Sequence, residues 1–277
     1  MLALLITVAA ALTLQVQTPP AESAAAAHAR AQAYFEKNEN TEALAAFDQA
    51  IALDPSTADS HVGRARTLAR LRRYDEAFVS YGEAARLAPG DAMVLRYRGH
   101  NYINVRKLDL ALADLTKAES MKKDDFGIYY HLALAHYLAG QFDRAAAAYE
   151  GCVRTAASDE DRVSCWAWQV PSLLRSSRQA EARAILDKVT PDLAVTENAS
   201  YLDRLLLFKG VKSEDEVGIQ MQASALNLST VGYGLGLWHL IKGRSEQARA
   251  YFDKATSGYY WPAFGFIAAE MELKRMK

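Results

Sequence analysis

Two prolines, Pro55 and Pro89, stand 34 residues apart, and the residues ahead of them recur in step. Small residues, large apolar residues and alanines occupy matching positions in four successive units. These positions hold Tyr34, Ala43, Phe47 and Ala50 in the first unit, Leu68, Ala77, Tyr81 and Ala84 in the second, Gly99, Tyr102, Ala111, Leu115 and Ala118 in the third, and Ala133, Ala145, Tyr149 and Cys152 in the fourth. A period of this length predicts stacked helix pairs, because no single pair can bury its apolar face alone.

The pattern resembles the tetratricopeptide repeat (TPR), which has a small residue at position 8, a large one at 11, alanine at 20, an aromatic residue or leucine at 24, and alanine at 27. Asp54-Pro55 and Ala88-Pro89-Gly90 should stop the second helices of the first two units. The sequence shows no alternating strand pattern longer than a few residues. We therefore expect an all-α TPR solenoid of antiparallel helix pairs, with about six units.

The period loosens in the second half of the chain. A degenerate fifth unit holds Trp166, Leu173, Ala182 and Leu186, and Pro171 inside its first helix should kink that helix near Gln169. A helical insert is expected near residues 190–228. A sixth unit then holds Gly236, Ala248, Phe252 and Ala255, and Trp261-Pro262 is expected to open a C-terminal capping helix that ends near Arg275.

The N-terminal segment has a different character from the repeats. Residues 2–14 are apolar throughout, and the first charged side chain is Glu22. Thirteen residues of helix rise about 20 Å, short of the roughly 30 Å hydrocarbon core of a bilayer. We expect residues 1–23 to be a cleaved signal peptide and residues 24–277 to form one TPR solenoid domain, exported to the periplasm or secreted. The alternative is a chain held to the membrane by an uncleaved N-terminal segment.

The charge and the motifs exclude several classes of function. Lysine and arginine number 32 against 33 aspartates and glutamates, so the formal charge of −1 gives no reason to expect docking on nucleic acid. His131 and His136 are five residues apart and do not form an HExxH zinc motif. The sequence contains neither a GxSxG nucleophile elbow nor a phosphate-binding P-loop. We expect no enzyme activity, no cofactor and no metal site.

The order of the units supports a narrower resemblance. Four regular repeats, a degenerate fifth, the insert around residues 201–210, a sixth repeat with the run Gly234-Leu-Gly-Leu-Trp-His-Leu-Ile-Lys-Gly-Arg244, and a cap resemble the NlpI-type TPR lipoproteins of bacterial envelopes. The resemblance implies a dimeric envelope adaptor that docks proteases and peptidoglycan hydrolases. The chain lacks the lipobox cysteine, so no stable membrane anchor is expected after signal cleavage.

Two functions are open at this stage: a non-catalytic adaptor that holds a partner polypeptide in the concave groove, and a dimerising scaffold that uses no groove ligand. By resemblance to other TPRs, the groove would be lined by Gln32, Arg66, Arg70, Arg96, His100, Asn104, Tyr130 and Tyr137. Such a row can pair with carboxylates, although the positions of the TPR carboxylate clamp are not reproduced. The alternative is an ordinary solvated helix face whose charges pair locally.

The later repeats offer apolar residues at the same groove positions, namely Leu134, Leu138, Leu174, Leu237, Leu240 and Ile241. An exposed stripe of this kind would be an interaction site, unless the insert at 190–228 or a second subunit covers it.

The chain has two cysteines, Cys152 and Cys165. Cys152 stands at the second-helix position that is normally a buried alanine, and Cys165 lies in the next helix of the solenoid. In an oxidising compartment these thiols would pair. The alternative is that both are small buried hydrophobic residues.

Overall fold

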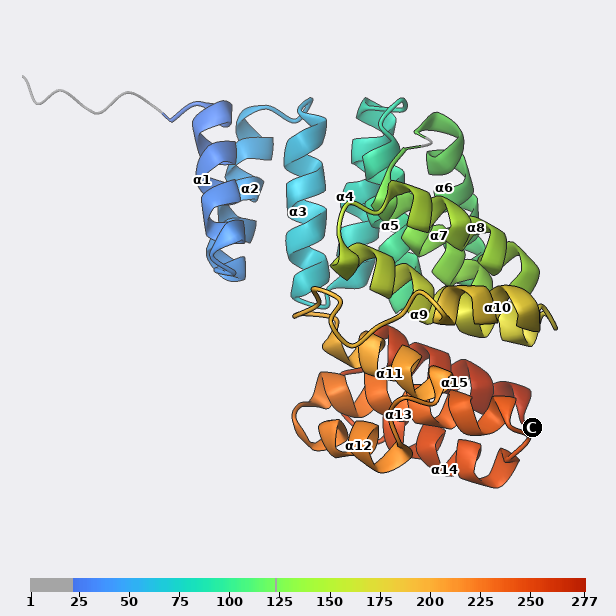
Figure 1. Cartoon of the computed structure of the whole chain (residues 1–277). Coiled ribbons are helices and arrows are strands. Elements are labelled where there is room, and N and C mark those ends of the chain that lie inside the picture. The colour runs from blue at the N-terminus through green and yellow to red at the C-terminus, as the bar shows by residue number, and fades with distance from the viewer. Residues whose placement is uncertain (1–21, 123) are drawn as a thin grey trace, which may run out of the picture.

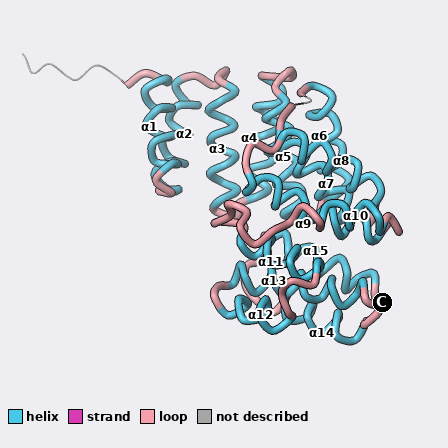
Figure 2. Tube along the Cα trace, in the orientation of Figure 1, coloured by secondary structure: helices cyan, strands magenta, loops and turns pink. Residues whose placement is uncertain are grey.

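The computed structural model describes residues 22–122 and 124–277, which fold into fifteen α-helices and one short 3-10 helix (Figures 1 and 2). The expected all-α TPR solenoid is confirmed for this part of the chain. The predicted signal peptide at 1–23 lies almost wholly outside the described residues. Within the described ranges, no helix combines the length and the apolar character needed to cross a bilayer.

The first four units are antiparallel helix pairs that stack side by side, as Figure 1 shows from blue to green. They pair α1 (Ala24–Glu36) with α2 (Asn40–Leu53), α3 (Ala58–Arg70) with α4 (Tyr74–Leu87), α5 (Ala92–Asn104) with α6 (Leu108–Met121), and α7 (Phe126–Leu138) with α8 (Phe142–Thr155). The helix lengths and turns follow the 34-residue period of the sequence.

Helices within a pair and in neighbouring pairs pack with a small residue of one helix set against a large residue of the other. A Cβ atom added to Gly99 of α5 would lie 2.6 Å from Leu115 of α6, and one added to Gly63 of α3 would lie 2.3 Å from Phe47 of α2. The large partners Phe47 and Leu115 are fully buried. This packing is the physical reason for the small-then-large pattern, because backbones can approach this closely only where one side chain is missing.

The turns inside the first four pairs share one backbone feature. Asn38, Arg72, Arg106 and Gly140 recur every 34 residues, and all four have a positive φ, between 60° and 77°. The left-handed conformation costs a residue with a Cβ atom roughly 1–2 kcal/mol, so the two arginines stand in a strained place. Both reach the C-terminal part of the chain: Arg106 pairs with Glu270 at 2.7 Å and donates to the carbonyl of Trp261, and Arg72 faces the ring of Trp261.

The fifth unit pairs α9 (Asp159–Arg175) with α10 (Gln179–Leu186). Pro171 lies inside α9, and the helix continues through it. A proline at this position leaves the carbonyl four residues earlier, that of Ala167, without its helical donor. Arg204 supplies the missing donor at 2.6 Å from α11, so the break in the hydrogen-bond ladder becomes an attachment point for the insert.

The insert contains α11 (Ala199–Lys209), α12 (Glu214–Gly218) and the 3-10 helix η1 (Ile219–Gln222). The sixth unit pairs α13 (Ala225–Ile241) with α14 (Ser245–Thr256), and α15 (Phe264–Arg275) ends the chain. The capping helix therefore begins two residues after Pro262 instead of at Trp261-Pro262, because Ala263 is extended, with φ −60° and ψ 135°.

The apolar stripe of the later repeats is covered by α13 and α15. Figure 1 shows these helices, in orange and red, beside α9 and α10 at the end of the stack. Leu134 and Leu138 of α7 share one buried cluster with Tyr233 and Leu237 of α13 and with Ile267 of α15. Tyr201 and Phe208 of the insert also pack against this cluster, which agrees in part with the expected cover by residues 190–228. The cover forms because the chain turns back after the insert and brings the sixth unit against the fourth.

Candidate functional site

An open groove remains over the first three units and ends at His131 of the fourth, against which Phe264 of α15 packs. It contains a cavity of about 350 Å³. The cavity is lined by residues of α1, α3, α4, α5 and α7, which are Phe35, Arg66, Ala69, Arg70, Tyr74, Tyr81, Arg96, Tyr97, His100, Asn101, Asn104 and His131. The first helices of successive pairs thus supply one continuous polar and aromatic surface.

Three arginines of this groove are stacked on aromatic rings. The guanidinium of Arg66 lies 4.7 Å from the ring centroids of both Phe35 and Tyr97. Arg70 lies 3.4 Å from the Phe35 centroid, and Arg96 lies 4.9 Å from that of Tyr97. Stacking positions the planar guanidinium groups. Arg70 also donates to the carbonyl oxygen of Phe35 at 2.6 Å, and its other N–H groups can still meet a ligand.

These arginines carry charge that the described part of the chain does not neutralise. None of the three forms a salt bridge with a carboxylate of residues 22–122 or 124–277, whereas Arg64 and Arg98, on the same helices, pair with Asp48 and Asp114. Burial and the neighbouring charge of Arg66 lower the pKa of Arg70. Arg66 and Arg70 therefore repel each other, and a carboxylate placed between them would offset this repulsion.

Two histidines lie in contact at one end of the groove. His100 Nδ1 is 2.6 Å from His131 Nε2, and His131 Nδ1 is 2.5 Å from the carbonyl oxygen of Gly127. Phe264 of α15 packs against His100, with ring centroids 5.6 Å apart. Burial, followed by the charge of Arg96, lowers the pKa of His100 to about 4, so the pair is neutral near pH 7.

The structure places five of the eight expected groove residues around the cavity, namely Arg66, Arg70, Arg96, His100 and Asn104. The other three lie elsewhere. Gln32 is on α1 and donates to Glu36 at 3.0 Å. Tyr130 and Tyr137 are buried in the core, where Tyr137 meets Tyr233 of α13 at 2.6 Å between hydroxyl oxygens. The assignment of these tyrosines to the open groove is corrected, because α13 and α15 fill the groove at the fourth unit.

Sequence reasoning missed the aromatic partners of the arginines. Tyr97 lies outside the helix positions assumed to face the groove, and Phe35 stands on one of those positions but was not among the expected residues, yet both line the cavity. Tyr74 begins α4 and joins them from the turn after α3. Only the superhelical twist of the pairs determines which rings meet which cations.

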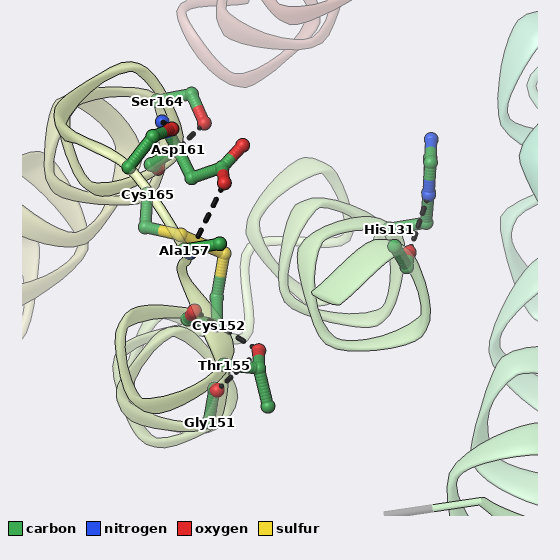
Figure 3. The surroundings of a disulfide bond; sticks show 10 residues. His131, Gly151, Cys152, Thr155, Ala157, Asp161, Ser164 and Cys165 are labelled. Carbon is green, nitrogen blue, oxygen red and sulfur yellow. Dashed lines mark hydrogen bonds between the residues drawn. A yellow bond between two sulfur atoms is a disulfide. The ribbon is translucent and has the colours of Figure 1, made fainter. Parts of the chain in front are cut away.

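The two cysteines are joined in the structure. Figure 3 shows the disulfide between Cys152 of α8 and Cys165 of α9, with Cα atoms 6.0 Å apart and both side chains fully buried. Beside it, Asp161 accepts from the backbone N–H of Ala157, which fixes the loop that leads into α9. The pairing therefore closes the connection between the fourth and fifth units.

The groove has the chemistry of non-covalent recognition. In the described ranges, no group of three or more histidine, cysteine, aspartate or glutamate side chains is arranged to hold a metal ion. The cavity offers guanidinium donors, aromatic faces, two amides and an imidazole. Such a set can bind an anionic or extended polypeptide ligand.

Comparisons with known proteins agree with this geometry. A family model described as Tetratricopeptide repeat matches residues 28–92 and 98–160. Serine/threonine-protein phosphatase 5 of Mus musculus is 29% identical over 115 residues, which cover 39% of this chain and 23% of the phosphatase. The chain thus spans about a quarter of the length of that relative.

Solved structures share the fold at low identity. One of pilF from Pseudomonas aeruginosa aligns over 92% of this chain and 97% of that chain, with a TM-score of 0.55 and 16% identity. YrrB, a TPR protein with an unusual peptide-binding site, aligns over 60% and 84%, with a TM-score of 0.51 and 20% identity. A chain of the APC/C Cut9–Hcn1 hetero-tetramer aligns over 92% and 43%, with a TM-score of 0.57 and 15% identity.

The period, the small-against-large packing and the family match concern the same stretch of sequence. Residues 28–92 and 98–160 match the tetratricopeptide repeat model, and in the structure this stretch forms the stacked helix pairs of a TPR-like solenoid.

Proposed function

We propose that this protein is a non-catalytic adaptor that holds a segment of a partner polypeptide in the groove of its first four repeats. The observation that supports it is the trio Arg66, Arg70 and Arg96, which faces an open cavity without a carboxylate partner in the described ranges. Arg66 and Arg96 are half-buried, and a half-buried cation without a carboxylate partner is stabilised when a ligand supplies one. YrrB, which shares the fold, has a peptide-binding site, and this agrees with the proposal.

We also propose that the protein acts outside the cytoplasm, in a bacterial envelope. The buried disulfide between Cys152 and Cys165 agrees with an oxidising compartment, as does the apolar run at 2–14. Intact-mass analysis of protein from its own host, after fractionation, tests this proposal. A chain that still begins at Met1, with two free thiols in the cytosolic fraction, would contradict it.

The dimerising scaffold has weaker support. This hypothesis was based on the apolar stripe of the later repeats. That stripe is not exposed to a second subunit at Leu134, Leu138 and Leu237, because these residues are buried in a cluster with α13 and α15 of the same chain. For the adaptor, the NlpI-type resemblance suggests envelope proteases or peptidoglycan hydrolases as partners.

Quantitative affinity capture from the native host tests the adaptor. The double variant Arg66→Ala/Arg96→Ala should lose its partner by roughly thirtyfold or more, since removing a charged anchor typically costs about 2 kcal/mol. The matched control is Arg86→Ala, because Arg86 is exposed on α4 and pairs locally with Glu83. Equal recovery of every protein by the double variant and by Arg86→Ala would show that the groove is not the binding site.

A further inference from the structure

The hydrogen bonds of the histidine pair determine which ring nitrogens of His100 and His131 carry a hydrogen. The carbonyl oxygen of Gly127 can only accept, so His131 Nδ1 carries a hydrogen and donates to it at 2.5 Å. In the neutral ring, His131 Nε2 is then a bare acceptor. His100 Nδ1, 2.6 Å away, must therefore donate to it. The result is a fixed tautomer of His100 in which Nε2 carries a lone pair and no hydrogen.

This remaining atom, His100 Nε2, is free to meet a ligand. His100 lines the cavity, and its Nε2 atom makes no hydrogen bond with any residue in the described ranges. Arg96 Nε is fully buried without a hydrogen-bond partner, but His100 Nε2 is not fully buried. The groove thus presents a solvent-accessible imidazole acceptor beside guanidinium donors.

The charged and titratable groups that face His100 are arginines, tyrosines and one histidine. The cations are Arg66 and Arg70 from α3 and Arg96 from α5 itself. The phenols are Tyr74 and Tyr81 from α4, Tyr97 from α5 and Tyr130 from α7. His131 of α7 is the hydrogen-bond partner, and α15 contributes the apolar ring of Phe264, while its Glu270 is held by Arg106.

A carboxylate in this groove would need donors on every side. The arginines supply them, but the bare Nε2 of neutral His100 would face the carboxylate with a lone pair. One proton taken from solvent onto Nε2 changes this acceptor into a donor. The carboxylate would at the same time offset the charge of Arg96, one of the two causes that lower the pKa of His100, the larger being burial.

We propose that the groove binds the aspartate or glutamate side chains of an acidic partner segment, and that a carboxylate enters together with one proton on His100 Nε2. The inference rests on the proposed function, since it names the chemistry of the segment that the groove holds. It makes capture of the partner dependent on pH in a range where the acidic segment itself stays charged.

The sign of the dependence follows from linkage. The pKa of His100 is about 4. A carboxylate beside it would raise this pKa, because an opposite charge favours the protonated imidazole. Protons therefore favour the bound state, and affinity rises as pH falls through the bound-state pKa. With a single linked proton, the rise is at most about tenfold per pH unit.

Fluorescence anisotropy with two labelled synthetic peptides tests the proposal on the full-length protein. One probe alternates glutamate and alanine, and the other has glutamine in place of each glutamate. Titrations run from about pH 8 to about pH 5.5, above the ordinary glutamate pKa of about 4.3. We expect the glutamate peptide to bind at least about tenfold more tightly than the glutamine peptide near pH 5.5, with a preference that shrinks toward pH 8.

Three variants separate the parts of the site. His100→Gln should retain the preference for glutamate and lose its pH dependence. Arg66→Ala/Arg96→Ala should lose the preference, with its fold checked by circular dichroism. The control is His136→Gln, because His136 lies outside the cavity and bonds to Gln141, and it should keep the wild-type pH dependence.

Equal binding of the two peptides, an affinity that does not change with pH, or an unchanged pH dependence in His100→Gln would each overturn the inference. The adaptor is tested separately by partner capture. If capture depends on Arg66 and Arg96 while the two peptides bind equally, the adaptor stands and its ligand is not an acidic segment.

Discussion

The contact between α13 and α15 leads to a sharp prediction for Gly265. A Cβ atom at this position would lie 2.5 Å from the backbone oxygen of Ser229, 2.8 Å from its carbonyl carbon and 2.8 Å from Cα of Thr230. Real Cβ atoms essentially never come within 3.0 Å of another heavy atom, and all three of these neighbours are backbone. No side-chain rotation can relieve the clash, so Gly265→Ala must push α15 away from α13 by about half an ångström.

The cost follows from what α15 buries. A gap of about half an ångström removes about a quarter of the dispersion energy of each contact that opens. Ile267, Ala268 and Ala269 of α15 are all fully buried, so several contacts weaken together. Overpacking of this kind typically costs about 1–3 kcal/mol. For a chain of this size we expect the thermal midpoint to fall by about 2–4 °C for each kcal/mol.

The matched control is Gly82→Ala. Gly82 lies inside α4, and a Cβ atom added there meets nothing within 4 Å. Alanine should therefore stabilise the helix by roughly 0.5–1 kcal/mol through its higher propensity. Thermal melts followed by circular dichroism compare the two variants with the wild type. If Gly265→Ala melts at or above the midpoint of Gly82→Ala, the close approach of α15 to α13 does not exist as described.

Two further predictions concern the disulfide and the histidine pair. Replacing Cys152 and Cys165 by alanine opens a loop with a sequence separation of 13 and should cost about 3 kcal/mol of unfolding free energy. Thermal melts with and without a reductant measure the loss, and a reductant that leaves the wild type unchanged would count against the bond. For the histidines, burial lowers the folded-state pKa of His100 to about 4 and that of His131 well below its usual value, so their contribution to stability is complete above the unfolded pKa of about 6.5 and is lost as pH falls toward 4. Urea unfolding should show a smaller loss over this range in His100→Gln than in the wild type, and equal losses would refute the assignment.

Local sequence patterns were enough to predict the repeats. The small residue Gly99 and the large residue Leu115 meet within one helix pair, as Gly236 and Phe252 do in the sixth unit, so these contacts depend only on short separations along the chain. The turn positions follow for the same reason, because each depends on the few residues beside it. The arginine row on α3 and α5 was likewise visible from the period.

The C-terminal part of the groove was not predictable in the same way. Tyr130 and Tyr137 occupy groove positions in the fourth unit, and a periodic pattern cannot show that a later unit covers them. The cover depends on Arg106 pairing with Glu270 across 164 residues of sequence, and on Arg204 bonding the carbonyl freed by Pro171. Both contacts depend on the path of the irregular insert, for which the sequence has no repeat to follow.

The sequence by itself determined the helix pairs, their order and the positions that pack within each unit, because these contacts recur at a fixed short spacing. Only the tertiary structure decided which part of the concave face is open. It leaves Arg66, Arg70, Arg96 and His100 around a cavity and buries the tyrosines of the next unit under α13 and α15. The physical reason is that a solenoid exposes its groove by default, and whether the chain fills that groove depends on contacts between residues far apart in sequence.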